Sequence, residues 1–290
     1  MQSSVSVYLL LFISSVSAEV VANFELCKKY FYKDHVPQWP AANTHIHICQ
    51  VNANSYRFAT LYDTINRIPI YSAYTVEENG KISRPRWMVE PQLVDQNYEK
   101  EMMTEDSLKY KHKVEPNVMG KRQALDEDYK KAPEKYDRGH LNPDSHHADD
   151  AAKATYTLTN IVPQKDKLNR GKWKEHEDKL RKLSNNNQVF VLVGAIPSSD
   201  NWIKINNEPR VNIPDYMWVA YCYFDRESNS FKSGGATAKN TENKLYECSL
   251  RDLQEFLQEH IQQVGQLFHE DCYEKKSAGP SGAGINPCNI

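Results

Sequence analysis

Apolar, β-branched and aromatic residues are concentrated in three segments, residues 155–163, 188–197 and 216–224, and this composition predicts a strand in each. The middle segment, QVFVLVGAIP, is almost entirely apolar, which is typical of a central strand buried on both faces. Earlier in the chain, residues 57–76 contain two β-rich runs on either side of the polar stretch DTINR. This pattern predicts a hairpin or two paired strands joined by a turn.

Two other segments have a helical pattern. Residues 169–183 have a helical composition with a few apolar positions, Trp173, Leu180 and Leu183. Ser249, followed three residues later by Asp252, predicts a capped helix start. The apolar residues after this cap recur at spacings of three and four, as expected for a helix that faces the core: Leu250, Leu253, Phe256, Leu257, Ile261, Val264, Leu267 and Phe268.

The order of these elements predicts the fold class. Residues 91–135 are polar and interrupted by Pro and Gly, so we expect mostly loop with short helical pieces there. Predicted strands lie on both sides of the short basic helix, which favours one α+β domain with a mixed central β-sheet and flanking helices. The composition, 40% apolar and 26% charged, is that of a globular protein rather than a disordered one.

The two ends of the chain have a different composition. Residues 1–18 carry no charge, contain a short apolar run and end in Val-Ser-Ala, which predicts a secretory signal peptide. A buried N-terminal strand remains the alternative, because a basic start is missing. Residues 19–54 are expected to form a largely irregular arm, and residues 271–290 a Gly-, Pro- and Ser-rich tail. No other segment approaches the roughly 18–20 apolar residues of a membrane span, so we expect a soluble, secreted, extracellular protein.

Six cysteines follow the predicted signal peptide, and an even number in an exported chain favours disulfides over metal binding. We favour a Cys27–Cys49 bond and leave the other pairing open. The net charge of −2 provides no global attraction to nucleic acid, so any such attraction must be local. Residues 164–182 contain eight Lys or Arg against four acids, and form either such a patch or the solvated face of a helix.

The stretch YDRGHLNPDSHH, residues 136–147, carries the strongest candidate chemistry. His140 is suited to act as a general base, because imidazole titrates near neutral pH. Arg138 offers planar paired donors to phosphate oxygens. Gly139 would let the backbone turn between these two residues, and we expect Asp137 to orient or neutralise a neighbour rather than to react. Taken alone, the motif could equally be a solvated turn.

Downstream of this motif lie TLTNIVPQ and LNRGKW, followed by Glu177. The order of strand, loop with His, strand, and helix with Asn and Glu resembles the ββα-metal finger of the DNA/RNA non-specific endonuclease family, over about residues 55–260. The stretch RFATLYDTINRIPIYSAY is similar to the secreted endonuclease domain-containing 1 group. We therefore expect a non-specific endonuclease domain at residues 55–270.

The resemblance implies roles for several residues. It makes Asn169 the single direct protein ligand of a Mg²⁺ ion, for which Mn²⁺ can substitute, and makes Glu177 act through metal-bound water. It gives Asn160 a supporting role by hydrogen bonding. On a helix, Asn169, Trp173 and Glu177 would share one face, with about 12 Å between the first and the last. Each residue also has an ordinary structural explanation, such as a helix cap for Asn169 or an i,i+4 pair of Glu177 with Arg181.

The family also has an arginine that binds phosphate near a Trp, and here both Arg84 and Arg86 are candidates beside Trp87. Lys165 and Arg170 are further candidates for substrate binding. We read His45, His47, His146 and His147 as having no direct function.

The leading hypothesis is a secreted, metal-dependent endonuclease that cleaves DNA and RNA without sequence preference, through contacts to backbone phosphates. The alternative is a catalytically silent secreted binding or defence protein on a nuclease scaffold. A third hypothesis keeps the hydrolytic site for a smaller phosphodiester. The sequence does not determine the preferred polymer or the oligomeric state.

Overall fold

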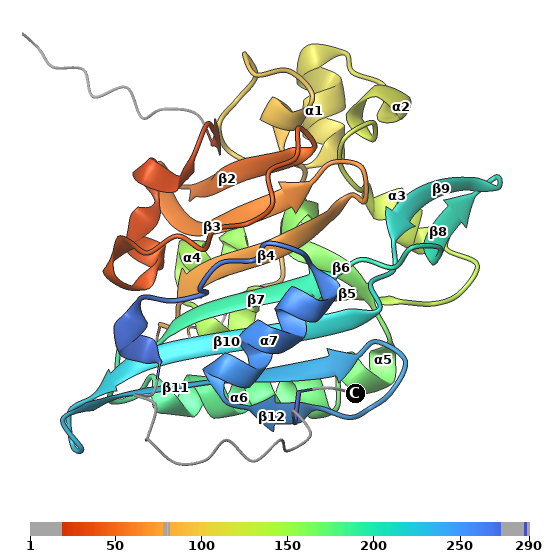
Figure 1. Cartoon of the computed structure of the whole chain (residues 1–290). Helices are drawn as coiled ribbons and strands as arrows, with labels where there is room; N and C mark the ends of the chain where they lie inside the picture. The colour runs from red at the N-terminus through yellow and green to blue at the C-terminus, as the bar shows by residue number, and fades with distance from the viewer. Residues whose placement is uncertain (1–18, 78–79, 81, 274–286, 289–290) are drawn as a thin grey trace, which may run out of the picture.

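A large antiparallel sheet forms the centre of the molecule in a computed structural model of the chain (Figure 1). The structure describes residues 19–77, 80, 82–273 and 287–288, so the predicted signal peptide and most of the predicted tail lie outside the described residues. The sheet has eight strands in the order β1-β2-β3-β4-β7-β10-β11-β12. Their bounds are Val20–Val21, His45–Asn52, Ser55–Asp63, Ile68–Thr75, Phe190–Ile196, Tyr216–Asp225, Ser230–Lys239 and Tyr246–Cys248.

Two short antiparallel ribbons lie outside this sheet. One pairs β5 (Asp137–His140) with β6 (Ile161–Gln164), and the other pairs β8 (Trp202–Ile205) with β9 (Glu208–Asn212). The α-helices α1 to α7 span Glu105–His112, Pro116–Met119, Asp126–Lys130, Asp149–Ala154, Asp166–Asn169, Lys172–Leu183 and Leu250–His260. Short 3-10 segments lie at Phe24–Leu26, Lys28–Tyr30, Tyr32–Asp34, Pro91–Leu93, Asp144–His146, Leu158–Asn160 and Glu270–Cys272.

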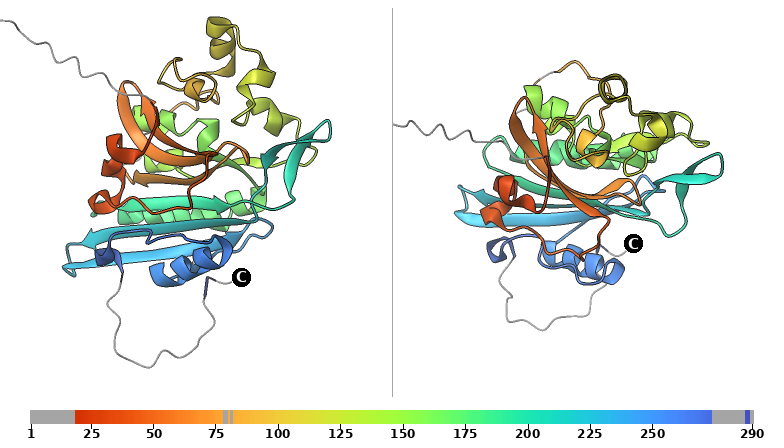
Figure 2. Two further views of the ribbon diagram at one scale, coloured as in Figure 1. Left: turned by 45° about the horizontal axis from the view of Figure 1, so that its top comes forward. Right: turned by 90° about the horizontal axis from the view of Figure 1, so that it is seen from above.

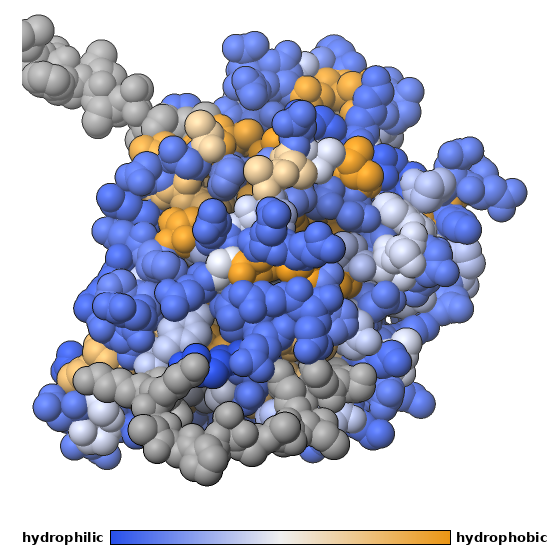
Figure 3. Space-filling model, viewed as in Figure 1, coloured by the Kyte–Doolittle hydropathy of each residue, from blue (hydrophilic) through white to orange (hydrophobic). Residues whose placement is uncertain are grey.

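Alternating side chains of the sheet build one core on each face. Along β10, Met217 belongs to the cluster that contains Trp173 of α6, whereas Trp218 belongs to the cluster that contains Phe256 of α7. Figure 2, seen from above, accordingly shows α7 on one face of the sheet and α6 on the other. Figure 3 shows that the face covered by α7 is mostly hydrophilic. The α+β class with a central sheet and flanking helices is confirmed, but the paired strands of the main sheet are all antiparallel rather than mixed.

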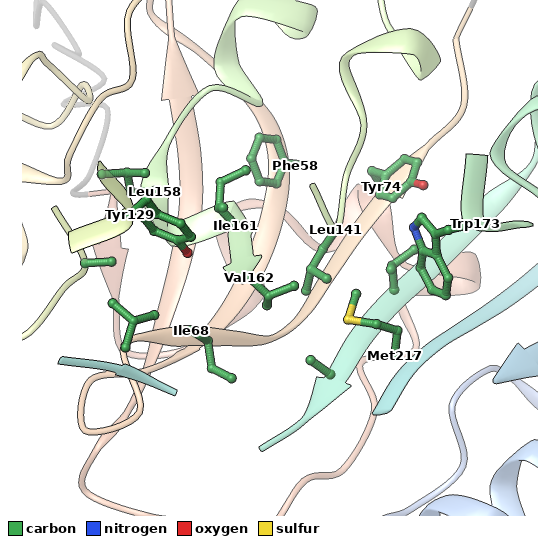
Figure 4. Packing of buried hydrophobic residues seen from close by; sticks show 14 of the residues in the cluster. Phe58, Ile68, Tyr74, Tyr129, Leu141, Leu158, Ile161, Val162, Trp173 and Met217 are labelled. Carbon is green, nitrogen blue, oxygen red and sulfur yellow. The ribbon is translucent and has the colours of Figure 1, made fainter. Parts of the chain in front are cut away.

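The core on the α6 face, which contains Met217 and Trp173, connects the β5–β6 ribbon to the sheet. Figure 4 shows Ile161 and Val162 of β6 and Leu141, which follows β5, in one cluster with Met217 of β10 and Trp173 of α6. The three ribbon side chains are 0–1% exposed. At about 1.5–3 kcal/mol for each large apolar side chain taken out of water, these contacts fix the ribbon against the sheet without any strand pairing between the two.

Several predicted elements are confirmed. Residues 57–76 form most of the β3–β4 pair, and β7 lies buried between β4 and β10 in the middle of the sheet. Helix α7 begins with the predicted capping box, because the Ser249 side chain accepts from the N–H of Asp252 and the Asp252 side chain from that of Ser249. The helix ends at His260, earlier than the apolar spacing suggested.

Three expectations were wrong. Of the predicted strand at 155–163, only residues 161–163 lie in a strand, β6, because a 3-10 turn precedes them. Residues 45–52, expected to be irregular, form strand β2 instead. The polar side chain in the buried part of β2 is paired: Gln50 is fully buried and donates to Glu19 Oε1 at 2.5 Å. The predicted helix at 169–183 is divided into α5 and α6.

The helix break lies at Gly171. A Cβ at this position would lie 2.4 Å from the carbonyl oxygen of Lys167 and 2.3 Å from Asn243 Oδ1, so only glycine fits without movement of the backbone. As a result, Asn169 ends α5 while Glu177 lies on α6. The two residues therefore do not share one straight helical face, contrary to the expectation from their spacing.

Disulfides connect both ends of the described chain to the sheet. The Cys27–Cys49 bond is confirmed, and Cys222–Cys272 and Cys248–Cys288 complete the set. The three bonds fit a protein of an oxidising compartment. Among the helices of the described ranges, none has the length and the apolar character needed to cross a bilayer.

Candidate active site

The β5–β6 ribbon and helices α5 and α6 border a cavity of about 660 Å³. Its lining is mostly charged and aromatic, and the residues around it are Arg84, Pro85, Trp87, Asp137, Arg138, His140, Pro143, Asp144, Ser145, Tyr156, Asn169, Arg170, Lys174 and Glu177. The segments that supply them are separated by up to 93 positions in the chain. The fold thus brings the DRGH motif, the Asn-Arg pair and the predicted glutamate to one cavity.

Gly139 is required by close packing within the ribbon. It pairs with Val162, and a Cβ on it would lie 2.7 Å from the Cβ and 2.2 Å from Oε1 of Gln164. The sequence suggested that Gly139 allows a turn, but its backbone is part of a regular strand. Glycine is required because the side chain of Gln164 occupies the space of a Cβ. The neighbouring residues Asp137, Arg138 and His140 all line the cavity.

Asp137 orients the residue predicted to bind the metal. Its carboxylate accepts from Asn169 Nδ2 at 3.0 Å and from the Arg170 guanidinium at 2.7 and 2.6 Å. Burial alone would raise the pKa of Asp137, but the hydrogen bonds from Arg170 and Asn169 outweigh it and hold the pKa below its usual value. Because the amide nitrogen of Asn169 is bonded to Asp137, its carbonyl oxygen is the atom available to a cation.

This donor set fits a hard divalent ion that keeps most of its water. An amide oxygen and nearby carboxylates are oxygen ligands of the kind that Mg²⁺ prefers, and Mg²⁺ usually needs only one or two protein ligands. Within the described residues, no group of three or more His, Cys, Asp or Glu side chains is arranged to hold a metal.

His140 lies between two aromatic rings. Its ring centroid is 5.3 Å from that of Trp87 and 5.2 Å from that of Tyr156. Burial lowers the pKa of His140 to about 4, while the charge of Asp144 opposes this shift and that of Arg84 adds to it. The imidazole is therefore neutral at pH 7 and can accept a proton.

The backbone of Glu177 is bonded to the turn that follows the DRGH motif, a contact that the sequence did not indicate. His146 Nε2 donates to the carbonyl oxygen of Glu177 at 2.9 Å, and the hydroxyl of Tyr74 donates to His146 Nδ1 at 3.1 Å. Burial lowers the pKa of His146 to about 3, so the neutral ring can serve as donor and acceptor at once. Burial also raises the pKa of the Glu177 carboxyl to about 8, with Lys174 opposing and Asp144 adding to the shift.

Arg138 is fixed at the edge of the cavity. Its guanidinium forms an ion pair with the Asp126 side chain and donates to the Asp126 carbonyl oxygen at 3.1 Å. It also lies over the rings of Trp87 and Tyr129, at 5.6 and 5.2 Å from their centroids. These contacts on several sides leave the cationic group with little freedom to move.

The structure separates the two arginines that the sequence left open. Arg84 lines the cavity, whereas Arg86 forms an ion pair with Asp106 at 2.9 Å and borders a different hollow. Arg170 lies at the cavity. Lys165 does not line the cavity, and its Nζ forms an ion pair with Glu134 at 2.7 Å.

Asn160 does not line the cavity either, because it is fully buried. Its amide accepts from Ser72 Oγ at 2.9 Å and from the Asn142 N–H at 3.0 Å, and donates to the carbonyl oxygens of Asn142 and Thr155. It therefore fixes the loop that follows His140 to strand β4.

Several residues of the lining had no predicted site role, among them Trp87, Asp144, Tyr156 and Lys174. Asp144 was visible only as an acid four positions after His140. Tyr156 could not be found from spacing, because its position depends on the backbone pairing of residues 88 and 157.

The chain is similar to known nucleases in sequence and fold. A model of the DNA/RNA non-specific endonuclease family matches residues 46–264. The Endonuclease domain-containing 1 protein of Homo sapiens is 33% identical over 211 residues, which cover 70% of this chain and 40% of that protein. The protein of the same name from Mus musculus is 30% identical over 260 residues, which cover 87% of this chain and 48% of that protein. The chain thus spans less than half the length of these curated relatives.

Among solved structures, the crystal structure of the EndoG/EndoGI complex matches with a TM-score of 0.51 and 16% identity, covering 79% of this chain and 86% of that chain. At this identity the likeness shows a shared fold. The family model matches more than half of the chain and includes the DRGH motif, Asn169 and Glu177, and the chain therefore belongs to the DNA/RNA non-specific endonuclease family.

Proposed function

We propose that the chain is a secreted endonuclease that hydrolyses phosphodiester bonds of DNA and RNA with the help of a divalent metal. The observation that carries this proposal is a neutral, half-buried imidazole on the same cavity as an oriented Asn169 and several cations. Phosphodiester hydrolysis needs a base for water, positive charge for the phosphoryl oxygens and stabilisation of the leaving oxygen. The cavity offers residues for the first two.

In this proposal His140 accepts the proton of the attacking water. A pKa near 4 keeps the base free at neutral pH, and the negative charge of Asp144 favours the imidazolium that forms. Arg84, Arg138 and Arg170 hold the phosphate and oppose the charge that develops on it. These groups are suited to phosphates rather than to bases, which accounts for cleavage without sequence preference.

Asn169 and Glu177 are the residues that would hold the metal, Asn169 directly and Glu177 through water. When bound, Mg²⁺ or Mn²⁺ would supply positive charge for the phosphoryl and leaving oxygens. Glu177 ionises more readily beside a cation, because an opposite charge favours the carboxylate. The three disulfides and the predicted signal peptide support secretion.

A cleavage assay on plasmid DNA and on a structured RNA tests the proposal. Purified wild type with Mg²⁺ or Mn²⁺ should nick both polymers, and EDTA should stop the reaction. His140→Ala should lose at least 10²-fold in rate, the usual contribution of general-base catalysis. His35→Ala is the matched control, because its ring bonds the Gln266 carbonyl oxygen and does not line the cavity.

The alternative, a silent protein on a nuclease scaffold, predicts a different result in the same assay. Such a protein would leave the plasmid and the RNA intact at every metal concentration. It would still bind DNA, and His140→Ala would bind as the wild type does. That pair of results would refute the enzymatic proposal.

A further inference from the structure

Two aromatic rings pack against His140. What we infer from this packing rests on the proposed function. Its Nε2 is buried and has no hydrogen-bond partner among the described residues. A catalytic histidine is usually held in place by an acceptor at the nitrogen that does not react. Here the rings of Trp87 and Tyr156 are the groups in contact with the imidazole, at interplanar angles of 41° and 77°.

The two rings are held as one unit. Their centroids lie 5.1 Å apart, and the residues next to them, Met88 and Thr157, form a parallel bridge. The N–H of Met88 donates to the Tyr156 carbonyl oxygen at 3.0 Å, and the N–H of Leu158 donates to that of Met88 at 2.9 Å. Backbone pairing therefore fixes the spacing between the rings that enclose the imidazole.

The far end of Tyr156 is fixed by Asp144. The Tyr156 hydroxyl donates to Asp144 Oδ2 at 2.6 Å, a length typical of a hydrogen bond to a charged group. Asp144 itself begins the 3-10 turn Asp144–His146, and its carbonyl oxygen accepts from the His147 N–H at 3.1 Å. The hydroxyl is thus bonded to the loop that follows His140.

We propose that Tyr156, held by Asp144, is a positioning residue that orients the imidazole of His140 toward the attacking water. The ring supplies the wall against which the imidazole rests, and the hydroxyl fixes that ring through Asp144. Asp144 has a second, separable effect, because its negative charge lies near the imidazole and opposes that of Arg84. Tyr156 and Asp144 thus act on the base, whereas the arginines of the proposed function act on the phosphate.

Four variants separate these contributions. Tyr156→Leu removes the ring, Tyr156→Phe removes only the hydroxyl, and Asp144→Asn keeps the shape but removes the charge. The matched control for the loss of a ring is Tyr110→Leu, since Tyr110 is 80% exposed on α1. Measurements are kcat and KM for a DNA substrate at saturating Mn²⁺, thermal unfolding, and a ¹⁵N NMR titration of the histidine rings.

For Tyr156→Leu we expect kcat to fall about 10²-fold, the effect of a base displaced by about 1 Å, with KM changed less than about 3-fold. Tyr156→Phe should fall between this variant and wild type. For Asp144→Asn, the titration of His140 should move to lower pH, because the charge that favours imidazolium is lost. Tyr110→Leu should match the wild type in all three measurements.

Three results would overturn the proposal. An increase in KM at unchanged kcat for Tyr156→Leu would make Tyr156 a substrate contact. A fall in kcat accompanied by loss of cooperative unfolding would make its role only structural. An unchanged His140 titration in Asp144→Asn would remove the electrostatic part. Because the NMR titration needs no turnover, it still tests the contact if the wild type proves inactive, in which case only the proposed function fails.

Discussion

Removal of the Asp137 carboxylate should weaken metal binding without unfolding the protein. In Asp137→Ala, Asn169 loses the acceptor at 3.0 Å that fixes its amide, and Arg170 loses both of its bonds to the carboxylate. The Arg170 side chain is largely exposed, so water screens its ion pair with Asp137 and the loss of this pair has a small effect. The main effect therefore passes through Asn169, whose carbonyl oxygen is no longer held toward the cavity.

The magnitude follows from the bond that is lost. A hydrogen bond to a charged group contributes about 1.5–3 kcal/mol, which corresponds to roughly 10- to 150-fold in an equilibrium constant. We expect the dissociation constant for Mn²⁺ to rise by this factor. Asp137→Asn keeps one neutral acceptor for Asn169 and should give an intermediate value, since neutral hydrogen bonds contribute about half as much.

Calorimetry or electron paramagnetic resonance of Mn²⁺ binding measures the effect directly, and cleavage at increasing Mn²⁺ gives a second reading. The control is Asp106→Ala, because Asp106 is exposed, pairs with Arg86 and borders a different hollow. The rate of Asp137→Ala should recover largely at saturating Mn²⁺. An unchanged dissociation constant together with a rate that no amount of Mn²⁺ restores would refute the reasoning.

Three further predictions concern packing, salt and pH. Gly139→Ala should lower the free energy of unfolding by about 1–3 kcal/mol in urea titrations, because its Cβ meets Gln164, and an unchanged midpoint would contradict this. Cleavage should fall with added NaCl with a logarithmic slope of about −2 to −3, as expected for three arginines on phosphates, and a rate independent of salt would exclude such contacts. Burial and the neighbouring Glu90 raise the pKa of Glu19, so the folded state holds the proton and its stability should decrease as pH rises above about 4.3. Glu19→Gln should flatten this dependence in thermal unfolding, and an equal slope in both proteins would refute the assignment.

The sequence located the segments that border the cavity, but not the side chains that hold them in place. His140 and Arg138 were singled out from the chemistry of their side chains, whereas Asn169 and Glu177 were assigned through the family resemblance. All four line the cavity. The choice between Arg84 and Arg86 could not be made from the sequence, because the direction in which each side chain points depends on the backbone conformation. Side chains that hold these residues were missed for the same reason.

Local patterns failed where tertiary contacts decide the structure. The break between α5 and α6 depends on Asn243, a residue 72 positions after Gly171, which no window of the sequence includes. Strand β2 is held by pairing with β1 and β3 and by the buried bond between Gln50 and Glu19, and the composition of residues 45–52 shows none of these contacts. Hydrophobic periodicity, by contrast, was sufficient for β7 and α7, because burial on one or both sides determines those elements.

The β5–β6 ribbon has a consequence for how this protein can vary. The ribbon packs on the sheet through the side chains of Leu141, Ile161 and Val162 and is not paired with any of its strands. Insertions at the edges of the sheet should therefore leave the positions of the site residues on the ribbon unchanged. Substitutions among those three apolar residues, in contrast, would disturb activity although none of them meets a reactant. Tolerance to substitution should thus be higher at the edge strand β1 than beneath the ribbon.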